Sequence, residues 1–374
     1  MDCEIKKLGD VLDYEQPTKY IVDSTDYNDV FKTPVLTAGK SFILGYTDEK
    51  VGIFENVPAI IFDDFTTAFH YVDFPFKVKS SAMKILKCDD AKDDLKFLYY
   101  QMTILRIDTQ LHKRYWISKF SKIKFSRPPL KTQQRIAGIL DNAAALRDKT
   151  AQLLTEYDLL AQSIFLEMFD NEEEVTIEKL LKNKTLILHK DGNHGGNYPR
   201  KEEFGKEGIP FLSAKHIDDN GQFNYKNVEF LNVAKAKTLT IGWLQKDDVL
   251  LSHNASVGKV TKYDGFFKEA LIGTSLTCYR PDKSILSPFY LQYHLMSPFF
   301  YRQLEKIMSQ STRNQVPITA QRKLKLKIPP IELQNEFADK IALIEQQKSL
   351  AKQELQESED LFNCLLQQAF KGEL

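Results

Sequence analysis

The sequence predicts an α+β fold made of two similar halves, each of which ends in a long helix. Two observations carry this prediction. Residues 122–169 align without a gap with residues 323–370, at a constant offset of 201 residues. The part of each half before this repeat alternates short apolar runs with Gly, Pro and Asn turns, whereas the repeat itself continues into a long stretch almost free of glycine and proline. We therefore expect a mixed globule followed by a helix, twice over.

Each repeated junction is typical of a short strand that two prolines stop. Basic and apolar residues alternate over 122–125 (KIKF) and over 323–326 (KLKL), which is the period of a half-buried strand. Diprolines follow at 128–129 and 329–330. Proline cannot donate to a β ladder and keeps the preceding residue extended. The helix is therefore expected to begin directly after each diproline.

The two helices carry a seam of apolar residues typical of a coiled coil, which breaks at the same place in both copies, at Arg147 and Lys348. Each helix spans ~40 residues, hence about 60 Å. One such helix alone could be a bundle element, but two equivalent ones are better explained as antiparallel partners or as docking faces for other chains. The seam residues are Ile136, Leu140, Ala143, Leu154, Ala161, Ile164 and Met168, with Phe337, Ile341, Ile344, Leu355, Phe362, Leu365 and Ala369 as their mates.

The repeat extends more weakly into the rest of each half. The corresponding segments are "IKKLGDVL" (5–12) with "TIEKLLKN" (176–183), "TPVLTAGK" (33–40) with "IPFLSAKH" (209–216), "VPAIIFDDF" (57–65) with "KDDVLLSHN" (246–254), and the aromatic helix "FLYYQM" (97–102) with "FYLQYHL" (289–295). The diprolines and the acidic break at 170–174 divide the chain into four parts. These are 1–129 (first globule), 130–172 (central helix), 173–329 (second globule) and 330–374 (C-terminal helix).

Composition indicates an ordinary soluble protein, with 43% apolar and 27% charged residues. No run of 18 apolar residues occurs, so no transmembrane helix is expected. The N-terminus lacks the apolar core of a signal peptide, which predicts a cytoplasmic location and no membrane partner. The four cysteines are scattered without CxxC spacing, which favours reduced, packed thiols over disulfides or zinc.

The formal net charge is zero, but the charge is unevenly distributed. Residues 76–129 hold 13 Lys/Arg against 5 Asp/Glu, and residues 173–330 hold 24 against 16, whereas residues 1–75 hold 6 against 14. Local positive charge, rather than the total, supplies contacts to phosphate. Two basic blocks of this kind are compatible with nucleic-acid binding and also with an uneven solvated surface.

Gly39-Lys40-Ser41 resembles the end of a Walker A motif, with Pro34 where the first glycine should stand. A P-loop must open a helix, so that backbone N–H groups face phosphate. Here the strand-like run 42–46 follows instead, and the counterpart at 213–216 has no glycine. A nucleotide-binding enzyme that uses Lys40 with Asp63 and Asp64 as a metal pair is the alternative function, although such an acidic pair more often caps a strand end.

Other catalytic templates are missing from the sequence. It has no Asn/Asp-Pro-Pro-aromatic loop of an adenine methyltransferase, no GxGxxG cofactor loop, and no HxxxH or HExxH spacing. We therefore predict no catalytic residue, no metal site and no cofactor bound by this chain.

If the globules bind DNA, polar groups on turns should read base edges beside Lys and Arg that contact phosphate. In each copy one turn before the last strand carries cationic and amide groups, because the 201-residue offset places 112–114 over 313–315. The candidates in the first half are Lys40, Ser41, Lys77, Lys79, Ser80, Ser81, Lys84, His112, Lys113, Arg114 and Tyr115. Those in the second half are Lys215, His216, Ser252, His253, Asn254, Ser256, Lys259, Thr274, Ser275, Arg313, Asn314 and Gln315.

The whole chain resembles the specificity (S) subunits of type I restriction–modification systems. The likeness rests on the order globule, helix, globule, helix, on the junctions "HKRYWISKFSKIKF…PPLKTQQRI" and "STRNQVPITAQRKLKLKIPPIELQNEFA", and on the end "LLQQAFKGEL". "TPVLTAGKSFILGY…" and "DDVLLSHNASVGKV" look like segments that recur in the recognition domains of this family. Base contacts vary too much in the family to be carried over.

The resemblance implies two target-recognition domains in a pseudo-twofold arrangement, separated by two long antiparallel coiled-coil helices. Each domain would read one half of a bipartite double-stranded DNA target, and about 60 Å of helix would suit half-sites roughly one DNA turn of ~34 Å apart. Two methyltransferase (M) subunits would dock on the helices, bring S-adenosylmethionine and methylate adenine by base flipping. A restriction (R) subunit, with ATP and Mg²⁺, would add cleavage. A DNA-free coiled-coil assembly protein is the remaining alternative.

Overall fold

The structure is a computed structural model that describes residues 3–39, 41–105, 115–195, 198–218, 221–254, 256–309 and 314–374. The chain divides into two compact units. Unit 1 comprises residues 1–153 together with 351–374, and unit 2 comprises residues 154–350. The predicted boundaries at 129/130, 172/173 and 329/330 stay a prediction.

Unit 1 contains a four-stranded antiparallel sheet in the order β2-β8-β5-β6 and a three-stranded sheet in the order β4-β3-β7, in which β3 and β7 are parallel. A separate pair joins its first and last strands, β1 and β9. The strands are β1 (Glu4–Lys7), β2 (Asp13–Glu15), β3 (Thr33–Leu36), β4 (Ile43–Thr47), β5 (Ala59–Asp63), β6 (Phe69–Val72), β7 (Lys77–Val78), β8 (Met83–Lys87) and β9 (Lys124–Arg127). The short helices are α1 (Leu8–Val11), η1 (Pro17–Tyr20), α2 (Leu95–Thr103), α3 (Tyr115–Ser118) and η2 (Phe120–Lys122).

Unit 2 has a similar topology, with a four-stranded second sheet in place of the three-stranded one. Its sheets have the orders β11-β18-β15-β16 and β12-β14-β13-β17, with β13 and β17 parallel, and β10 pairs with β19. The strands are β10 (Glu174–Thr176), β11 (Leu186–Asp191), β12 (Phe204–Gly205), β13 (Ile209–Leu212), β14 (Glu229–Leu231), β15 (Val249–Ser252), β16 (Val260–Lys262), β17 (Leu271–Ile272), β18 (Leu276–Pro281) and β19 (Lys325–Lys327). The short helices are α5 (Ile177–Lys182), η4 (Lys201–Glu203), η5 (Ala214–His216), α6 (Val233–Ala236), α7 (Pro288–Met296), α8 (Pro298–Met308) and α9 (Ile318–Gln321).

The sequence repeat therefore marks equivalent elements. β3 and β13 hold Pro34 and Pro210 and each pairs in parallel with a short later strand. β5 and β15 each lie between two antiparallel neighbours. The predicted junction strands begin two residues later than expected, because Lys122 and Lys323 still close turns, with their N–H groups donating to the Lys119 and Ala320 carbonyls.

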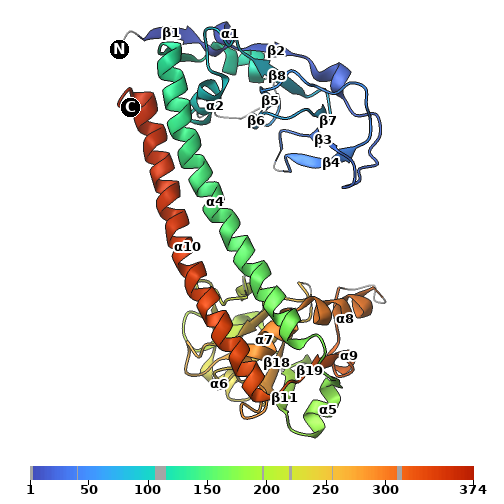
Figure 1. The fold of residues 1–374 in the computed structure, drawn as a ribbon. Helices are drawn as coiled ribbons and strands as arrows, with labels where there is room; N and C mark the ends of the chain where they lie inside the picture. Colours follow the sequence, from blue (N-terminus) through green and yellow to red (C-terminus); the bar gives the residue numbers. More distant parts are fainter. Residues whose placement is uncertain are drawn as a thin grey trace. The chain divides into compact units, whose positions relative to one another are not determined.

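The two long helices, α4 (Leu130–Phe169) and α10 (Ile331–Lys371), begin directly after the diprolines, as predicted (Figure 1). In unit 1 the first turns of α4, through Ile136 and Leu140, share a core with the last turns of α10. In unit 2 the last turns of α4 pack on the first turns of α10, where the ring centroids of Phe169 and Phe337 lie 5.4 Å apart. The antiparallel contact of the two helices is thus confirmed.

The predicted seam residues on both helices are buried or half-buried. The cations that break the seam find partners inside their own unit. The Arg147 guanidinium lies over the Phe362 ring at 4.9 Å, and the Lys348 ammonium pairs with Asp158 at 2.7 Å. At the break, the apolar seam of each helix is thus interrupted by one cation that has a partner within its own unit.

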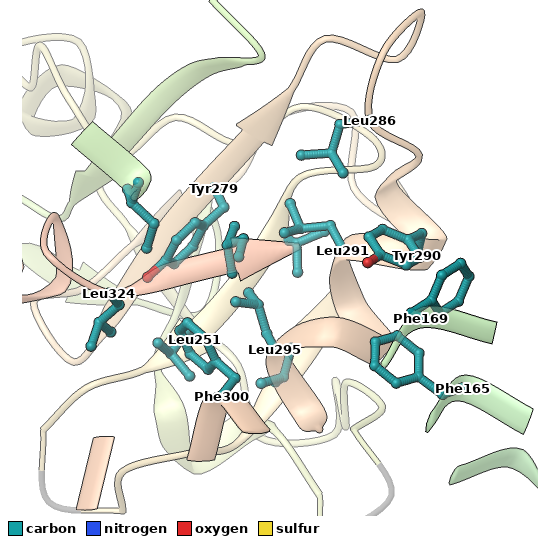
Figure 2. Close-up of a cluster of buried hydrophobic side chains, with 14 of the residues drawn as sticks. Phe165, Phe169, Leu251, Tyr279, Leu286, Tyr290, Leu291, Leu295, Phe300 and Leu324 are labelled. Carbon is teal, nitrogen blue, oxygen red and sulfur yellow. The ribbon is translucent and has the colours of Figure 1, made fainter. Parts of the chain in front are cut away.

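The largest core of unit 2 joins its main sheet to both long helices. Figure 2 shows Tyr290 of α7 beside Phe165 and Phe169 of α4, with Leu251 and Tyr279 from the sheet nearby. The ring centroids of Phe169 and Tyr290 are 4.8 Å apart in an edge-to-face arrangement, which aromatic pairs prefer. The main sheet is thereby fixed to the helices within this unit.

Among the described residues, no helix is long and apolar enough to span a bilayer.

Candidate nucleic-acid interface

The candidate residues of unit 2 lie on loops that hydrogen bonds bring together at one end of its sheets. The Ala214 N–H donates to Ser275 Oγ (3.1 Å), and the His253 N–H donates to the Ser275 carbonyl (3.1 Å). The Lys259 ammonium donates to the Ile217 carbonyl (3.1 Å). Segments far apart in the sequence therefore form one loop cluster after β13, β15 and β17.

The segment before α9 joins the same cluster. Asn254 forms an isolated antiparallel bridge with Gln315, and the Val316 N–H donates to the His253 carbonyl at 2.8 Å. Asn254 and Asn314 are exposed, and Gln315 is half-buried. The amide side chains that the sequence singled out are thus brought together on one surface.

A buried polar network supports this loop cluster from below. Gln321 Oε1 accepts from Tyr279 Oη (2.7 Å) and lies 3.2 Å from His189 Nε2. Gln321 Nε2 donates to the Val316 carbonyl (2.9 Å) and to Thr277 Oγ1 (3.0 Å). Because the amide of Gln321 is fully buried and satisfied on both sides, it fixes the chain that leads into the loops.

Two of the candidate histidines are neutral parts of this framework. His253 Nδ1 lies 2.9 Å from Thr277 Oγ1, and burial lowers the pKa of His253. His216 Nδ1 accepts from the Ser213 N–H (3.0 Å), and burial also lowers the pKa of His216. Both imidazoles are buried, so they shape the loops rather than present charge.

The other candidates of unit 2 differ in their exposure. Ser252 is fully buried, and its hydroxyl donates to the Ser256 carbonyl and accepts from the Lys259 N–H (2.8 Å). Lys215 is exposed and pairs with Glu229 at 2.6 Å. Exposed Ser256 and half-buried Lys259, Thr274 and Ser275 complete the set.

In unit 1 the equivalent position is the turn after β5. The Asp64 N–H donates to the Ala82 carbonyl (3.2 Å), and the Tyr115 N–H donates to the Asp64 carbonyl (3.1 Å). The exposed candidates Ser80 and Ser81 directly precede Ala82, whereas Tyr115 is buried. The candidates Ser80, Ser81 and Tyr115 therefore lie beside one turn of unit 1.

Lys77 and Lys84, expected from the sequence as phosphate contacts, are placed inside unit 1. The Lys77 ammonium pairs with Glu49 (2.7 Å) and donates to the Val51 carbonyl (2.6 Å). The Lys84 ammonium lies 3.5 Å from an Asp64 carboxylate oxygen and donates to Gln16 Oε1 (3.1 Å). Both side chains are almost fully buried, so their charges stabilise the loops of the folded chain. The sequence could not show this, because the partner carboxylates lie elsewhere in it.

Ser41 and Lys79 are exposed, and the Lys79 ammonium lies 5.8 Å from the centre of the Tyr27 ring. The remaining candidates, Lys40, His112, Lys113, Arg114 and Arg313, lie outside the described residues.

The nucleotide–metal interpretation is not favoured by the fold of unit 1. The next element after Ser41 is strand β4, whereas a P-loop must lead into a helix whose N–H groups face the phosphate. Asp63 Oδ1 accepts from the Phe65 and Thr66 N–H groups (2.7 and 2.9 Å), and buried Asp64 Oδ1 accepts from the Trp116 N–H (2.8 Å). Over the described residues, no three His, Cys, Asp or Glu side chains gather as metal ligands.

Phe65, an exposed residue at the turn after β5, was not among the candidates predicted from the sequence. Phe65 lies in the β5–β6 turn and is 51% exposed. The signal that could have found it is the alignment of 57–65 with 246–254, which places Phe65 opposite Asn254.

Comparisons with known proteins agree with this architecture. The family model described as "Type I restriction modification DNA specificity domain" matches residues 1–156 and 180–359. The specificity subunit of the type I restriction enzyme EcoR124I/EcoR124II from Escherichia coli is 42% identical over 235 residues, which are 58% of this chain and 56% of that protein. The chain thus aligns with about half the length of this relative. The MjaVIII specificity subunit from Methanocaldococcus jannaschii is 21% identical, over 96% of this chain and 89% of that protein.

Two solved structures share the fold over nearly the whole chain. A chain from a study of the assembly and conformational transition of the type I R-M system covers 100% of this chain and 98% of its own length, with a TM-score of 0.59 and 17% identity. The S subunit of the type I restriction-modification system from M. genitalium covers 99% and 96%, with a TM-score of 0.52 and 18% identity. At this identity the likeness shows the fold alone. The family model, which matches most of the chain, identifies it as a member of the family of type I restriction–modification specificity subunits.

Proposed function

We propose that this chain is the DNA-reading, non-catalytic subunit of a type I restriction–modification complex, and that each recognition domain reads one half of a bipartite target. The observation that carries this proposal is the repeated topology, in which each unit ends its β5- or β15-type strand in a polar loop cluster. Two similar reading surfaces on one chain suit a target made of two parts. The domains would be 1–129 and 173–329, joined by the helices 130–172 and 330–374.

We further propose that the long helices dock two methyltransferase subunits. Both helices bury one seam in their own units yet expose leucines on other faces. Exposed apolar side chains along a helix fit a protein partner better than solvent. The exposed leucines are Leu146, Leu159, Leu160 and Leu166 on α4, and Leu343, Leu350 and Leu361 on α10.

The chemistry in this proposal belongs to the partners. The methyltransferase subunits would supply S-adenosylmethionine and methylate one adenine per half-site, and a restriction subunit would supply the ATP- and Mg²⁺-dependent cleavage. The complex would act in the cytoplasm, where it meets double-stranded DNA. This chain would contribute sequence selection and the spacing between the half-sites.

Single-molecule methylome sequencing tests the proposal. Cells that express the chain with its methyltransferase subunit should carry a bipartite adenine-methylation motif that disappears when the chain alone is deleted. A motif that persists after deletion, with the methyltransferase subunit still expressed, would contradict the proposal.

A binding measurement distinguishes this proposal from the alternative of a DNA-free assembly protein. The chain purified together with its methyltransferase subunit should bind a duplex that carries the motif much more tightly than a scrambled duplex of the same length. Equal binding to both duplexes would favour the assembly role.

A further inference from the structure

We propose that Phe65 and Asn254 are equivalent specificity-determining residues, each directly after the residue that anchors the reader turn of its unit. The reader turns are residues 63–68 in unit 1 and, among the described residues, 252–254 and 256–259 in unit 2. Phe65 would make an apolar contact with a thymine methyl group, and Asn254 would form hydrogen bonds with the edge of an adenine in the other half-site. This inference rests on the proposed function, because it assigns a residue to each half of the bipartite target.

The two turns are held by the same backbone hydrogen bonds from outside. In unit 1 the Asp64 N–H donates to the Ala82 carbonyl and the Asp64 carbonyl accepts from the Tyr115 N–H. In unit 2 the His253 N–H donates to the Ser275 carbonyl and the His253 carbonyl accepts from the Val316 N–H. Tyr115 and Val316 are themselves related by the 201-residue offset. Residues 64 and 253 thus have the same place in the fold, and residues 65 and 254 directly follow them in the chain.

The turns also close in the same way. The Asp63 N–H donates to the Ala68 carbonyl (2.8 Å), as the Ser252 N–H does to the Lys259 carbonyl (2.8 Å). The Thr67 N–H donates to the Asp63 carbonyl, as the Gly258 N–H does to the Ser252 carbonyl, both at 3.0 Å. Thr67 and Gly258 both have positive φ angles, of 62° and 98°. The equivalence therefore includes the hydrogen bonds that close each turn, although more residues lie between them in unit 2.

The turn of unit 1 is built to hold Phe65 in one place. The Asp63 carboxylate accepts from the Phe65 N–H, and Asp64 is anchored to the Trp116 N–H and to Lys84. A reading residue needs such a supporting shell, because its contact depends on a fixed position.

Phe65 and Asn254 differ in their chemistry, so they would suit different bases in the two half-sites. A single exposed apolar side chain is common on protein surfaces, so the place of Phe65 opposite Asn254 carries the argument and its exposure does not. Phenylalanine can contact the C5-methyl group of thymine in the major groove, whereas asparagine pairs with adenine N6 and N7. Each half-site holds a thymine if an adenine is methylated in it, because that adenine is paired.

The test uses the reconstituted complex of this chain with its methyltransferase subunits. Duplexes carrying the methylome-derived motif are compared with duplexes in which one thymine at a time is replaced by deoxyuridine, which lacks the methyl group. The wild-type complex should lose about threefold to tenfold in affinity at one thymine of one half-site. The Phe65→Ala variant should bind the motif less tightly and should lose no further affinity when that thymine is replaced by deoxyuridine. The Phe65→Leu variant should still lose some affinity on this replacement.

The matching experiment for unit 2 replaces each adenine by 7-deazaadenine, which lacks N7. The wild-type complex should lose about fivefold or more at an adenine of the opposite half-site, and Asn254→Ala should be indifferent to this replacement. Val30→Ala is the control, since Val30 is 81% exposed in unit 1 outside the reader turn. The Val30→Ala variant should discriminate thymine from deoxyuridine, and adenine from 7-deazaadenine, as the wild type does.

The outcomes separate the two proposals. A wild-type complex without a bipartite motif would overturn the proposed function. A wild-type complex with the motif, together with a Phe65→Ala variant that still discriminates thymine from deoxyuridine, would overturn this inference alone. Effects of Phe65→Ala and Asn254→Ala in the same half-site would also overturn it.

Discussion

Gln133 and Gln334 make equivalent hydrogen bonds in the two units. Each is fully buried near the start of a long helix, and each side-chain oxygen accepts from the N-terminal cap residue of a shorter helix, Asp94 of α2 (2.9 Å) or Ser287 of α7 (2.8 Å). Each amide nitrogen donates to the carbonyl of the first proline of the diproline, at 2.9 and 2.8 Å. The two glutamines therefore fix the long helices to their globules by one repeated device.

Replacing either glutamine by leucine should destabilise its unit. Gln133→Leu leaves the Asp94 N–H and the Pro128 carbonyl buried without a partner, which costs about 2–3 kcal/mol of unfolding free energy. Gln334→Leu should cost a similar amount in unit 2. Urea denaturation followed by circular dichroism measures the change. Gln367→Leu, at an exposed position of α10, is the control and should change little; equal effects of all three variants would argue against the device.

Lys77→Met tests whether this lysine is a structural cation rather than a phosphate contact. The variant leaves the half-buried Glu49 carboxylate without its ammonium partner, and removal of one member of a buried ion pair costs about 3 kcal/mol. Lys19→Met breaks the exposed Lys19–Glu15 pair of 2.8 Å and should cost less than about 1 kcal/mol. Thermal melting compares the two variants, and a Lys77→Met variant as stable as the wild type would contradict the placement.

The Lys77–Glu49 pair should also make part of the stability of unit 1 sensitive to acid. Burial raises the pKa of Glu49, but Lys77 and the Ser24 and Asp23 N–H groups outweigh it and hold the pKa below its usual value. Stability from this pair is therefore fully present above the ordinary carboxyl pKa of about 4.5 and is lost as the pH falls through the lower folded-state pKa. Melting curves from pH 7 to pH 3 should show a shallower acid dependence for Lys77→Met. The same pH dependence of the melting temperature in the variant and the wild type would refute the role of this ion pair.

Thr67→Gly should stabilise unit 1. Thr67 has a φ of 62°, a left-handed conformation that costs a β-branched residue about 1 kcal/mol, and glycine adopts it freely. The reciprocal change, Gly258→Ala in unit 2, should destabilise, since the new Cβ would lie 2.7 Å from the Tyr301 ring. Chemical denaturation of both variants should give shifts of opposite sign, and shifts of the same sign would contradict the equivalence of the two turns.

Acidification below pH 6.5 should weaken unit 2 through its buried histidines. Burial lowers the pKa of His189 to about 4 and that of His294 to about 3. The unfolded chain protonates these side chains near pH 6.5, so their stabilising effect is complete above that pH and is lost as the pH falls toward their folded-state values. The loss at pH 5 amounts to about 2 kcal/mol for each of them.

Hydrogen exchange, corrected for the intrinsic rate at each pH, measures this effect separately for the two units. Between pH 7.5 and pH 5.0 the strands β15 and β18 of unit 2 should lose protection. His189→Gln should reduce the loss. Protection unchanged in these strands would show that the histidines accept protons without unfolding.

The long helices and the repeat could be predicted from the sequence because their signals are local. The diprolines mark the helix starts, and the seam from Ile136 to Met168 is a pattern within one element. The parallel pairing of β3 with β7 could not be predicted, because it depends on contacts between distant segments. The alignment points to Phe65 only once Asn254 is known to lie in the loop cluster of unit 2.

The candidate sites were predicted less completely than the fold. The sequence singled out Asn254, Ser275 and Gln315 as candidate base readers, and the structure brings them into one loop cluster; their contact with DNA stays a prediction. It could not separate Lys79, which is exposed, from Lys77 and Lys84, whose charges are paired inside the unit with Glu49 and Asp64. Residue type and spacing do not reveal a buried partner from another segment.

The central claim is that each unit reads its own half of the target, and one methylome experiment tests it most directly. Cells carrying the chain with Lys113→Ala and Arg114→Ala are compared with cells carrying the wild-type chain, with the same methyltransferase subunit in both. The account predicts that the recognised bases change or relax in one half-site while the other half-site and the gap stay the same. Equal loss of specificity in both half-sites would contradict it.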